Sequence, residues 1–135
     1  MATKTIRFEP TVVGDEIILD NDARLTSELL WTNGTPSANF AAQTLGFDVS
    51  EYKFLGILFH HSTSSTNGTF VIVYNIQGKY QLALDVQAGK ILFRNYQVNS
   101  NNKLEFADCY TINSYGSGGQ ASNSSLIPYQ IYGLK

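Results

Sequence analysis

Two adjacent histidines, His60 and His61, are the first residues whose chemistry suggests a binding site. They follow the apolar run Phe54–Phe59, which is typical of a β-strand, and neighbouring side chains of a strand point to opposite faces of a sheet. The two imidazoles therefore cannot easily bind one metal ion, and the sequence has no second His or Cys pair to complete a four-ligand site. We expect polar residues at a strand end, with no metal and no other cofactor.

Acidic residues are the next candidates, because glycoside hydrolysis needs two carboxyl groups held a fixed distance apart around a cleft. Asp108 stands out, since the alternation of its strand places it on one face with Phe106 and Tyr110, where a carboxylate needs hydrogen-bonding partners. We expect a hydrogen-bonded structural role for Asp108, with catalysis as the alternative. The acidic residues considered are Asp48, Glu51, Asp85, Glu105 and Asp108.

Nucleophile and phosphate-binding motifs are incomplete in this sequence. There is no G-x-S-x-G motif, and Cys109 has no neighbouring histidine. The run GSGG at 116–119 lacks the Lys-Ser/Thr of a P-loop and no helix follows it, so we expect a flexible loop. Triplets beginning at Asn33, Asn67 and Asn123 match the glycosylation sequon, but an Asn-rich chain without a signal peptide produces such matches by chance. These patterns predict a protein that is not an enzyme.

Aromatic and amide side chains around Tyr96 offer a different chemistry. Tyr96 precedes a turn that contains Asn99, Asn101 and Asn102, and sugar rings stack on aromatic faces while amides bind their hydroxyls. We therefore predict a glycan contact formed by these four residues, with Tyr115 beside GSGG as a weaker candidate. The alternative is that they are ordinary residues of an amphipathic strand and a turn.

The elements that must position these residues are predicted to be β-strands. Period-2 alternation runs through Tyr80–Val86 and 104–112, as in half-exposed strands. Phe54–Phe59 and Phe70–Tyr74 are apolar on both faces, which is typical of central strands covered by a second sheet on one side and by a loop or neighbouring subunit on the other. An uncovered face would leave an apolar patch larger than monomers usually tolerate, so the pattern predicts self-association.

Turn-forming residues separate these strands and indicate antiparallel pairing. Gln77-Gly78 and Asn99–Asn102 are predicted hairpin turns, and Ser62–Gly68 is a predicted polar loop. Tyr115–Ser125 is expected to be a long loop, and Ser50–Lys53 a single helical turn capped by Ser50. The sequence thus predicts an all-β fold, an antiparallel, jelly-roll-like β-sandwich of seven to nine strands.

The chain's one tryptophan, Trp31, ends a short predicted strand that begins at Leu29. The loop Thr32–Asn39 follows, and Phe40 then begins an extended segment in which Leu45, Phe47 and Val49 face one way. We expect Trp31 to pack against that sheet, and the alternative is an exposed sugar-stacking or interface role.

The length and composition of the chain exclude several classes of protein. A chain of 135 residues fits one domain, 1–135, in which residues 1–23 belong either to the sandwich or to an N-terminal attachment segment. Charged residues form only 15% of the chain against roughly 25% in typical proteins, while Asn, Ser and Thr total 34. A net charge of −2 without any basic cluster argues against nucleic-acid binding, and no apolar run is long enough to span a membrane. With a single cysteine and no signal peptide, synthesis and folding in the cytoplasm are expected.

Two stretches of the sequence have a distinctive pattern. The first is LLWTNGTPSANFAAQTLGFDVSEYKFLGILF, residues 29–59, with its Leu-Trp-x-Asn, a Pro/Ser turn and Phe-Ala-Ala-Gln-Thr. The second is the C-terminal SLIPYQIYGLK, which contains Ile-Pro-x-x-Ile-Tyr-Gly-x-Lys. Both stretches resemble segments of tail-associated and minor structural proteins of phages and prophages of Gram-positive bacteria. Gly34 departs from the pattern, and so does the short chain, since such modules often end much longer fibres.

The resemblance implies a tail-tip or fibre-head module of a virion, made in the bacterial cytoplasm. It implies a homo-oligomer, most commonly a trimer, with other tail proteins and a cell-wall glycan as partners, and neither nucleic acid nor membrane. A free-standing bacterial carbohydrate-binding module is the alternative, and an enzyme ranks third.

Overall fold

The structure is a computed structural model of the chain that describes residues 11–13, 16–18, 24–113 and 119–135, with side-chain exposure described from residue 26 onward. The described residues form strands, turns and loops but no helix. The strands are β1 (Thr11–Val13), β2 (Glu16–Ile18), β3 (Arg24–Thr32), β4 (Gln43–Thr44), β5 (Phe54–Ser62), β6 (Gly68–Tyr74), β7 (Gln81–Gln87), β8 (Lys90–Val98), β9 (Leu104–Asn113), β10 (Gln120–Ala121) and β11 (Ser125–Leu134).

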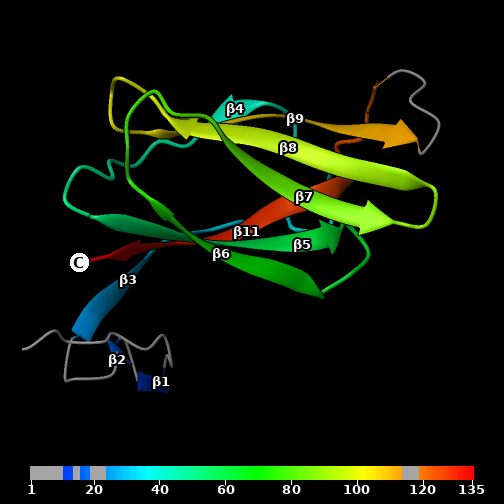
Figure 1. Cartoon of the computed structure of the whole chain (residues 1–135). Helices are drawn as coiled ribbons and strands as arrows, with labels where there is room; N and C mark the ends of the chain where they lie inside the picture. Colours follow the sequence, from blue (N-terminus) through cyan, green and yellow to red (C-terminus); the bar gives the residue numbers. More distant parts are fainter. Residues whose placement is uncertain (1–10, 14–15, 19–23, 114–118) are drawn as a thin grey trace, which may run out of the picture.

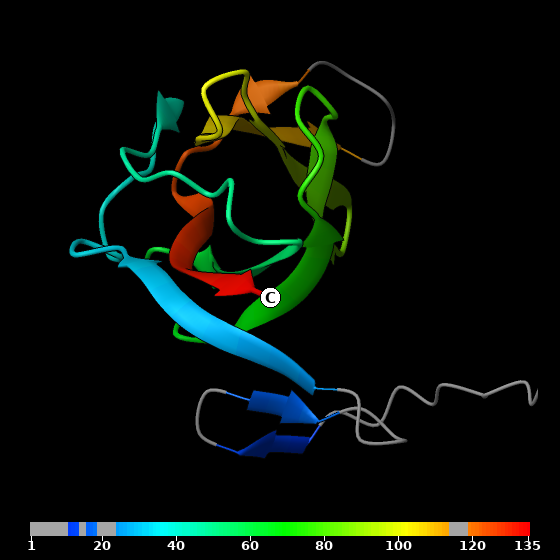
Figure 2. The same cartoon turned by 90° about the vertical axis from the view of Figure 1, so that its left-hand side faces the viewer.

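The strands form two antiparallel sheets that face each other (Figure 1). One sheet has the order β1-β2-β3-β11-β5-β6, and the other has the order β10-β9-β8-β7 with β4 also paired to β9. Seen from the end in Figure 2, the strands enclose a common interior. The all-β antiparallel sandwich is therefore confirmed, with nine described strands of at least three residues.

The β1–β2 hairpin extends the first sheet beyond the sandwich, and among the described strands it pairs with the rest of the sheet through β3 (Figure 2). Its strand β2 pairs with the first part of β3, where Ile18 lies opposite Arg24 and Glu16 opposite Thr26. The later part of β3 pairs with β11 inside the sandwich. The other residues of the predicted attachment segment 1–23 lie outside the described residues.

Aromatic and branched side chains from both sheets fill the interior. Phe59 of β5 lies 6.3 Å from Phe106 of β9 between ring centroids, and Phe40 meets Phe106 edge-on at 5.7 Å. Such pairs add about 0.5–1.5 kcal/mol beyond the burial of their area. Trp31 is half-buried and packs edge-on against Phe40, as expected for a core position.

A fully buried arginine, Arg94 on β8, ties the two sheets together. Its exposed fraction is 0%, and its guanidinium donates to the backbone carbonyls of Leu126 at 2.9 Å, Ala107 at 2.7 Å and Ser125 at 3.1 Å. The guanidinium carbon also lies 5.3 Å from the centroid of the Phe40 ring. Burial lowers the pKa of this side chain, because the charged form loses its hydration. The planar fork of donors offsets that cost by satisfying carbonyls from three positions at once.

A β-bulge in β9 changes which side chains face the interior. Arg94 pairs with Cys109 but Tyr96 pairs with Phe106, so two residues of β9, Ala107 and Asp108, oppose the single residue Asn95. Phe106 and Cys109 are therefore both buried, whereas Tyr110 is exposed on the outer face. The prediction of unbroken alternation through 104–112 is wrong at this point.

Three predicted connections differ in outcome. Asn99–Asn102 does form the β8–β9 hairpin turn, with Asn102 at a φ of 57°. Gln77-Gly78 is a turn, but it carries the chain from β6 in one sheet to β7 in the other, so the predicted hairpin is wrong. The tight hairpin turn instead joins β7 to β8 at Ala88-Gly89, where Gly89 has a φ of 78° that glycine adopts without strain. The loop between β5 and β6 agrees with the prediction.

The predicted helical turn at Ser50–Lys53 is also wrong. Asp48 takes the capping role there, because its carboxylate accepts hydrogen bonds from the backbone N–H and the hydroxyl of Ser50 and forms a local turn. The backbone N–H of Tyr52 donates to the Val49 carbonyl at 3.1 Å. The chain then enters β5 directly, without a helix.

Candidate functional site

The predicted glycan contact does not assemble as expected, because Tyr96 is a core residue. Its side chain is 3% exposed, and its ring lies 5.8 Å from Phe59 and 5.6 Å from Phe106 between centroids. Loss of hydration in this apolar setting raises the pKa of Tyr96 to about 12. An aromatic face for a sugar is therefore not available here, and this part of the prediction is corrected.

The asparagines of the adjoining turn mostly serve the turn itself. The Asn99 carboxamide oxygen accepts from the backbone N–H of Asn101 at 2.9 Å and of Lys103 at 3.2 Å. The Asn102 carboxamide oxygen accepts from the Gln77 amide at 2.5 Å, whereas Asn101 is exposed. The turn thus presents Asn101 without a neighbouring aromatic face from Tyr96. Tyr115, the weaker candidate, lies outside the described residues.

Asp108 holds loops in place. Its carboxylate accepts from the Ala42 backbone N–H at 2.8 Å and from the Asn123 side-chain amide at 2.9 Å. These two hydrogen bonds lower the pKa of Asp108, because both stabilise the charged form. Asn123 in turn accepts from the Cys109 backbone N–H. This arrangement fits the structural role expected for Asp108.

The two histidines take separate places. His60 is buried and stacks on Tyr129 at 4.1 Å between centroids, whereas His61 lies 3.5 Å from the Asp85 carboxylate of the other sheet. Within the described ranges, no group of three or more His, Cys, Asp or Glu side chains converges as a metal site would require. The same residues contain no helix long and apolar enough to span a membrane.

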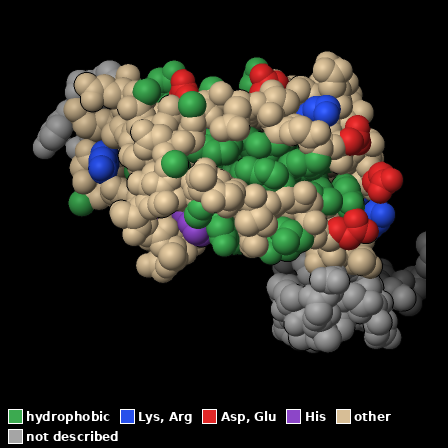
Figure 3. Space-filling view, turned by 180° about the vertical axis from the view of Figure 1, so that it is seen from behind, with side chains coloured by type: hydrophobic (Ala, Val, Ile, Leu, Met, Phe, Trp, Pro, Cys, Tyr) green, Lys and Arg blue, Asp and Glu red, His purple; other side chains and the backbone are tan. Residues whose placement is uncertain are grey.

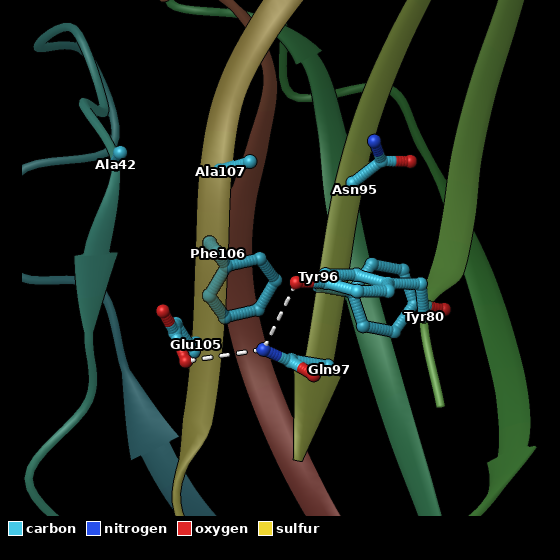
Figure 4. A pocket seen from close by; sticks show the side chains of 8 residues that line it. All are labelled: Ala42, Tyr80, Asn95, Tyr96, Gln97, Glu105, Phe106 and Ala107. Atoms are coloured by element: carbon cyan, nitrogen blue, oxygen red, sulfur yellow. Dashed lines mark hydrogen bonds between the residues drawn. The ribbon is translucent and has the colours of Figure 1, made fainter. Parts of the chain in front are cut away.

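A surface pocket lies on the same sheet as Tyr96, close to the predicted glycan contact, and shares only Tyr96 with it among the described residues (Figure 4). Its volume is about 260 Å³. The exposed ring of Tyr80 and the side chains of Gln97 and Glu105 supply its aromatic and polar groups. Tyr96 does line this pocket, but as a buried residue. The described residues that line it are Ala42, Tyr80, Asn95, Tyr96, Gln97, Glu105, Phe106 and Ala107.

Strand register positions the polar groups of this pocket. Gln97 of β8 lies directly opposite Glu105 of β9, so their side chains share the outer face of the sheet. The Gln97 amide nitrogen lies 3.3 Å from the Glu105 carboxylate and 3.4 Å from the Tyr80 hydroxyl, to both of which it donates. Thr44 of β4 pairs with Glu105, which brings Ala42 to the far side of the pocket.

The outer face of this sheet is apolar beyond the pocket. Two rows of paired residues run across the three strands. Leu84, Phe93 and Tyr110 form one row, and Val86, Ile91 and Ile112 form the next. Val86 is 74% exposed. We call this surface the β7–β9 patch, and its members are Leu82, Leu84, Val86, Ile91, Phe93, Tyr110 and Ile112.

The other sheet also has an apolar outer face, which its own side chains partly cover. The Phe70 ring of β6 lies over Gly56 of β5, where an added Cβ would come within 2.6 Å of the ring, and it meets Tyr132 edge-on. Thus β5 is central, as predicted, but β6 is an edge strand and the prediction for Phe70–Tyr74 is wrong. Ile72 and Tyr74 stay exposed.

Charged groups are sparse on the side of the molecule opposite to Figure 1. Figure 3 shows hydrophobic side chains gathered in a band across this side, with acidic and basic side chains near its margins. The low charged content of the sequence is therefore visible as a surface property. Binding by hydrogen bonds and apolar contact suits such a surface better than long-range charge attraction.

No protein-family model, curated protein or solved structure matches this chain.

Proposed function

We propose that this chain is a non-enzymatic structural protein of the phage or prophage tail type, a tail-tip or fibre-head module that assembles as a homo-oligomer and recognises a host-surface glycan. The observation that carries the proposal is the β7–β9 patch, in which three neighbouring strands present apolar side chains to solvent. Monomeric proteins rarely expose continuous apolar patches of more than a few hundred Å², and larger ones mark interaction surfaces. The tail setting itself rests on the sequence resemblance of residues 29–59 and of the C-terminus.

A second copy of the chain is the occupant that the patch fits best. Its side chains are uncharged and lie on a regular sheet, so the surface offers no charge that would select a different, charged partner. The patch also reaches an edge strand, because β7 has a sheet neighbour only on its β8 side among the described strands. Exposed edges are sites of strand pairing between chains, and burial in an assembly removes that hazard. A trimer is the expected size.

Paired aspartate substitutions test this proposal. Leu84→Asp places a charge in the middle of the patch, and assembly would then have to bury an unpaired carboxylate. We expect sedimentation velocity to show an oligomer for the unmodified chain and at least about tenfold weaker association for Leu84→Asp, equivalent to about 1.4 kcal/mol.

Ile72→Asp is the matched control, because Ile72 is an exposed aliphatic residue on the outer face of the other sheet. It should leave the oligomer unchanged. Equal effects of the two substitutions, or an unmodified chain that sediments at 14.9 kDa, would contradict the proposal.

A free-standing carbohydrate-binding module is the second candidate function, and the pocket beside Tyr80 favours it. The two candidates differ in their genetic setting, since tail-tape-measure, holin and endolysin genes should neighbour a tail protein. Glycoside hydrolase genes should neighbour a carbohydrate-binding module. The purified chain should hydrolyse neither cell-wall polymers nor common glycosides under either reading.

A further inference from the structure

We infer that the pocket lined by Tyr80, Gln97 and Glu105 is a binding site for one neutral sugar residue of a glycan. This inference deepens the glycan-recognition part of the proposed function, and it does not depend on self-association. The aromatic element is the Tyr80 ring, which precedes β7 and is 69% exposed. The hydrogen bond from Gln97 to the Tyr80 hydroxyl orients the ring toward β8 and β9 (Figure 4). A ring held in this way offers an apolar face to the C–H groups of a pyranose.

The polar groups around the ring suit hydroxyls. Gln97 and Asn95 can each donate and accept hydrogen bonds, and the Glu105 carboxylate accepts only. A sugar hydroxyl, which both donates and accepts, is complementary to this mixture. The Gln97 contacts, at 3.3 and 3.4 Å, are longer than the usual 2.9–3.0 Å of an N–H···O hydrogen bond. A sugar hydroxyl can therefore take over the contact between Gln97 and Glu105 at little cost.

Charge and size narrow the class of ligand. Among the described residues, no lysine or arginine lines the pocket, and Glu105 repels phosphates and carboxylates, so a neutral ligand is favoured over an anionic one. A quaternary ammonium ligand would require a cage of aromatic faces, whereas Tyr80 is the one exposed ring in this lining. The volume of about 260 Å³ lies just below the usual range for drug-sized ligands, roughly 300–1,000 Å³, and fits a single sugar ring.

The affinity follows from ligand size. A hexose has about 12 non-hydrogen atoms, and about 0.3 kcal/mol for each atom corresponds to a Kd on the order of 1 mM. Measurable recognition of a cell surface would then come from several copies binding one polymer together.

Amide NMR titration of the full chain tests the inference. The probes are the methyl glycosides of glucose, galactose, N-acetylglucosamine and rhamnose, each taken to about 50 mM, at which a site with a Kd of about 1–10 mM is mostly filled. We expect at least one probe to shift the amide signals of residues 95–97 and 105–107. Tyr80→Ala should weaken that binding at least tenfold, while Tyr80→Phe, which keeps the ring, should weaken it less than about threefold.

Two controls separate this site from other surfaces. Tyr74→Ala removes a tyrosine of similar exposure, 63%, from the other sheet and should not change the affinity. Asn101→Ala tests the exposed amide of the turn and should also leave the affinity unchanged. Absence of any saturable shift, shifts confined to the turn, or saturable binding of choline in place of the sugars would each overturn the inference. None of these results bears on the oligomer, so the assembly proposal stands or falls separately.

Discussion

Replacement of Arg94 by methionine should produce one of the largest losses of stability available in this chain. The side chain is fully buried, and its three hydrogen bonds all end on backbone carbonyls, those of Ala107, Ser125 and Leu126. Methionine fills a similar length of the core but donates no hydrogen bond. The substitution therefore leaves carbonyls of two strands without their donors.

The size of the loss can be worked from these contacts. Each buried carbonyl that loses its partner costs about 1–3 kcal/mol, so three of them cost about 3–9 kcal/mol. Removal of a buried charge returns several kcal/mol of desolvation penalty. Taking the middle of the first range, about 6 kcal/mol, less about 3 kcal/mol of recovered desolvation penalty, we expect a net loss of about 3 kcal/mol in the free energy of unfolding. A typical domain has a total of about 5–15 kcal/mol.

Urea denaturation followed by tryptophan fluorescence measures this loss, since Trp31 packs against the core through Phe40. With an m-value of about 1–3 kcal/mol/M, the midpoint should fall by about 2 M. Lys90→Met is the matched control, because Lys90 is exposed next to the β7–β8 turn, and its midpoint should hardly change. A loss below about 1 kcal/mol for Arg94→Met would refute the role assigned to Arg94.

Three further predictions concern stability and titration. Tyr96→Ala should lower the free energy of unfolding by about 3–5 kcal/mol, as for other buried aromatic residues, and an unchanged urea midpoint would show the ring not to be core. Because its hydrogen bonds lower the pKa of Asp108 in the folded state, the stability that this carboxylate contributes is present above about pH 4 and is lost as the pH falls through its folded pKa. In an acid titration followed by circular dichroism, Asp108→Asn should therefore lose less of its stability between about pH 4 and the folded pKa than the unmodified chain does. Identical acid profiles of the two proteins would contradict this role of Asp108. The pKa of Tyr52 is raised to about 12, chiefly by its hydrogen bond to Glu28, and that of Tyr96 is also about 12. Both tyrosines contribute their full stability below about pH 10 and lose it as the pH rises toward 12. Tyrosinate absorbance should therefore show two tyrosines that ionise later than the others, and the absence of this late ionisation would contradict the raised pKa values.

Strand positions could be predicted from the sequence, but the direction of their faces could not. The alternation of residues 80–86 correctly predicted strand β7. The two runs that are apolar on both faces correctly predicted strands β5 and β6. On β8, however, outward Ile91 and Phe93 are as apolar as inward Leu92 and Tyr96. Period-2 alternation with apolar residues on both faces does not tell which face is inside. This is the physical reason why Tyr96 was expected to be exposed.

The remaining features of the site could not be predicted, because they depend on pairing between residues far apart in the sequence. The bulge at Ala107–Asp108 depends on the pairing with β8, and no residue type in this stretch predicts it. Tyr80 continues the alternation of Leu82 and Leu84, an apolar set that the period-2 pattern would place inside, whereas all three side chains are exposed. Its neighbours Gln97 and Glu105 meet only through the register of β8 against β9. The burial of Arg94 could not be predicted from the sequence either, since charged residues are rarely fully buried.

The central claim is that the β7–β9 patch is covered by another copy of the chain. The most direct measurement is methyl NMR of the assembled protein with a soluble paramagnetic probe, which broadens the signals of exposed methyl groups. The methyl groups of Leu82, Leu84, Val86 and Ile91 should be shielded, while those of Ile76, which is 47% exposed outside the patch, should broaden. Broadening of the four patch residues to the same extent as Ile76 would contradict the claim.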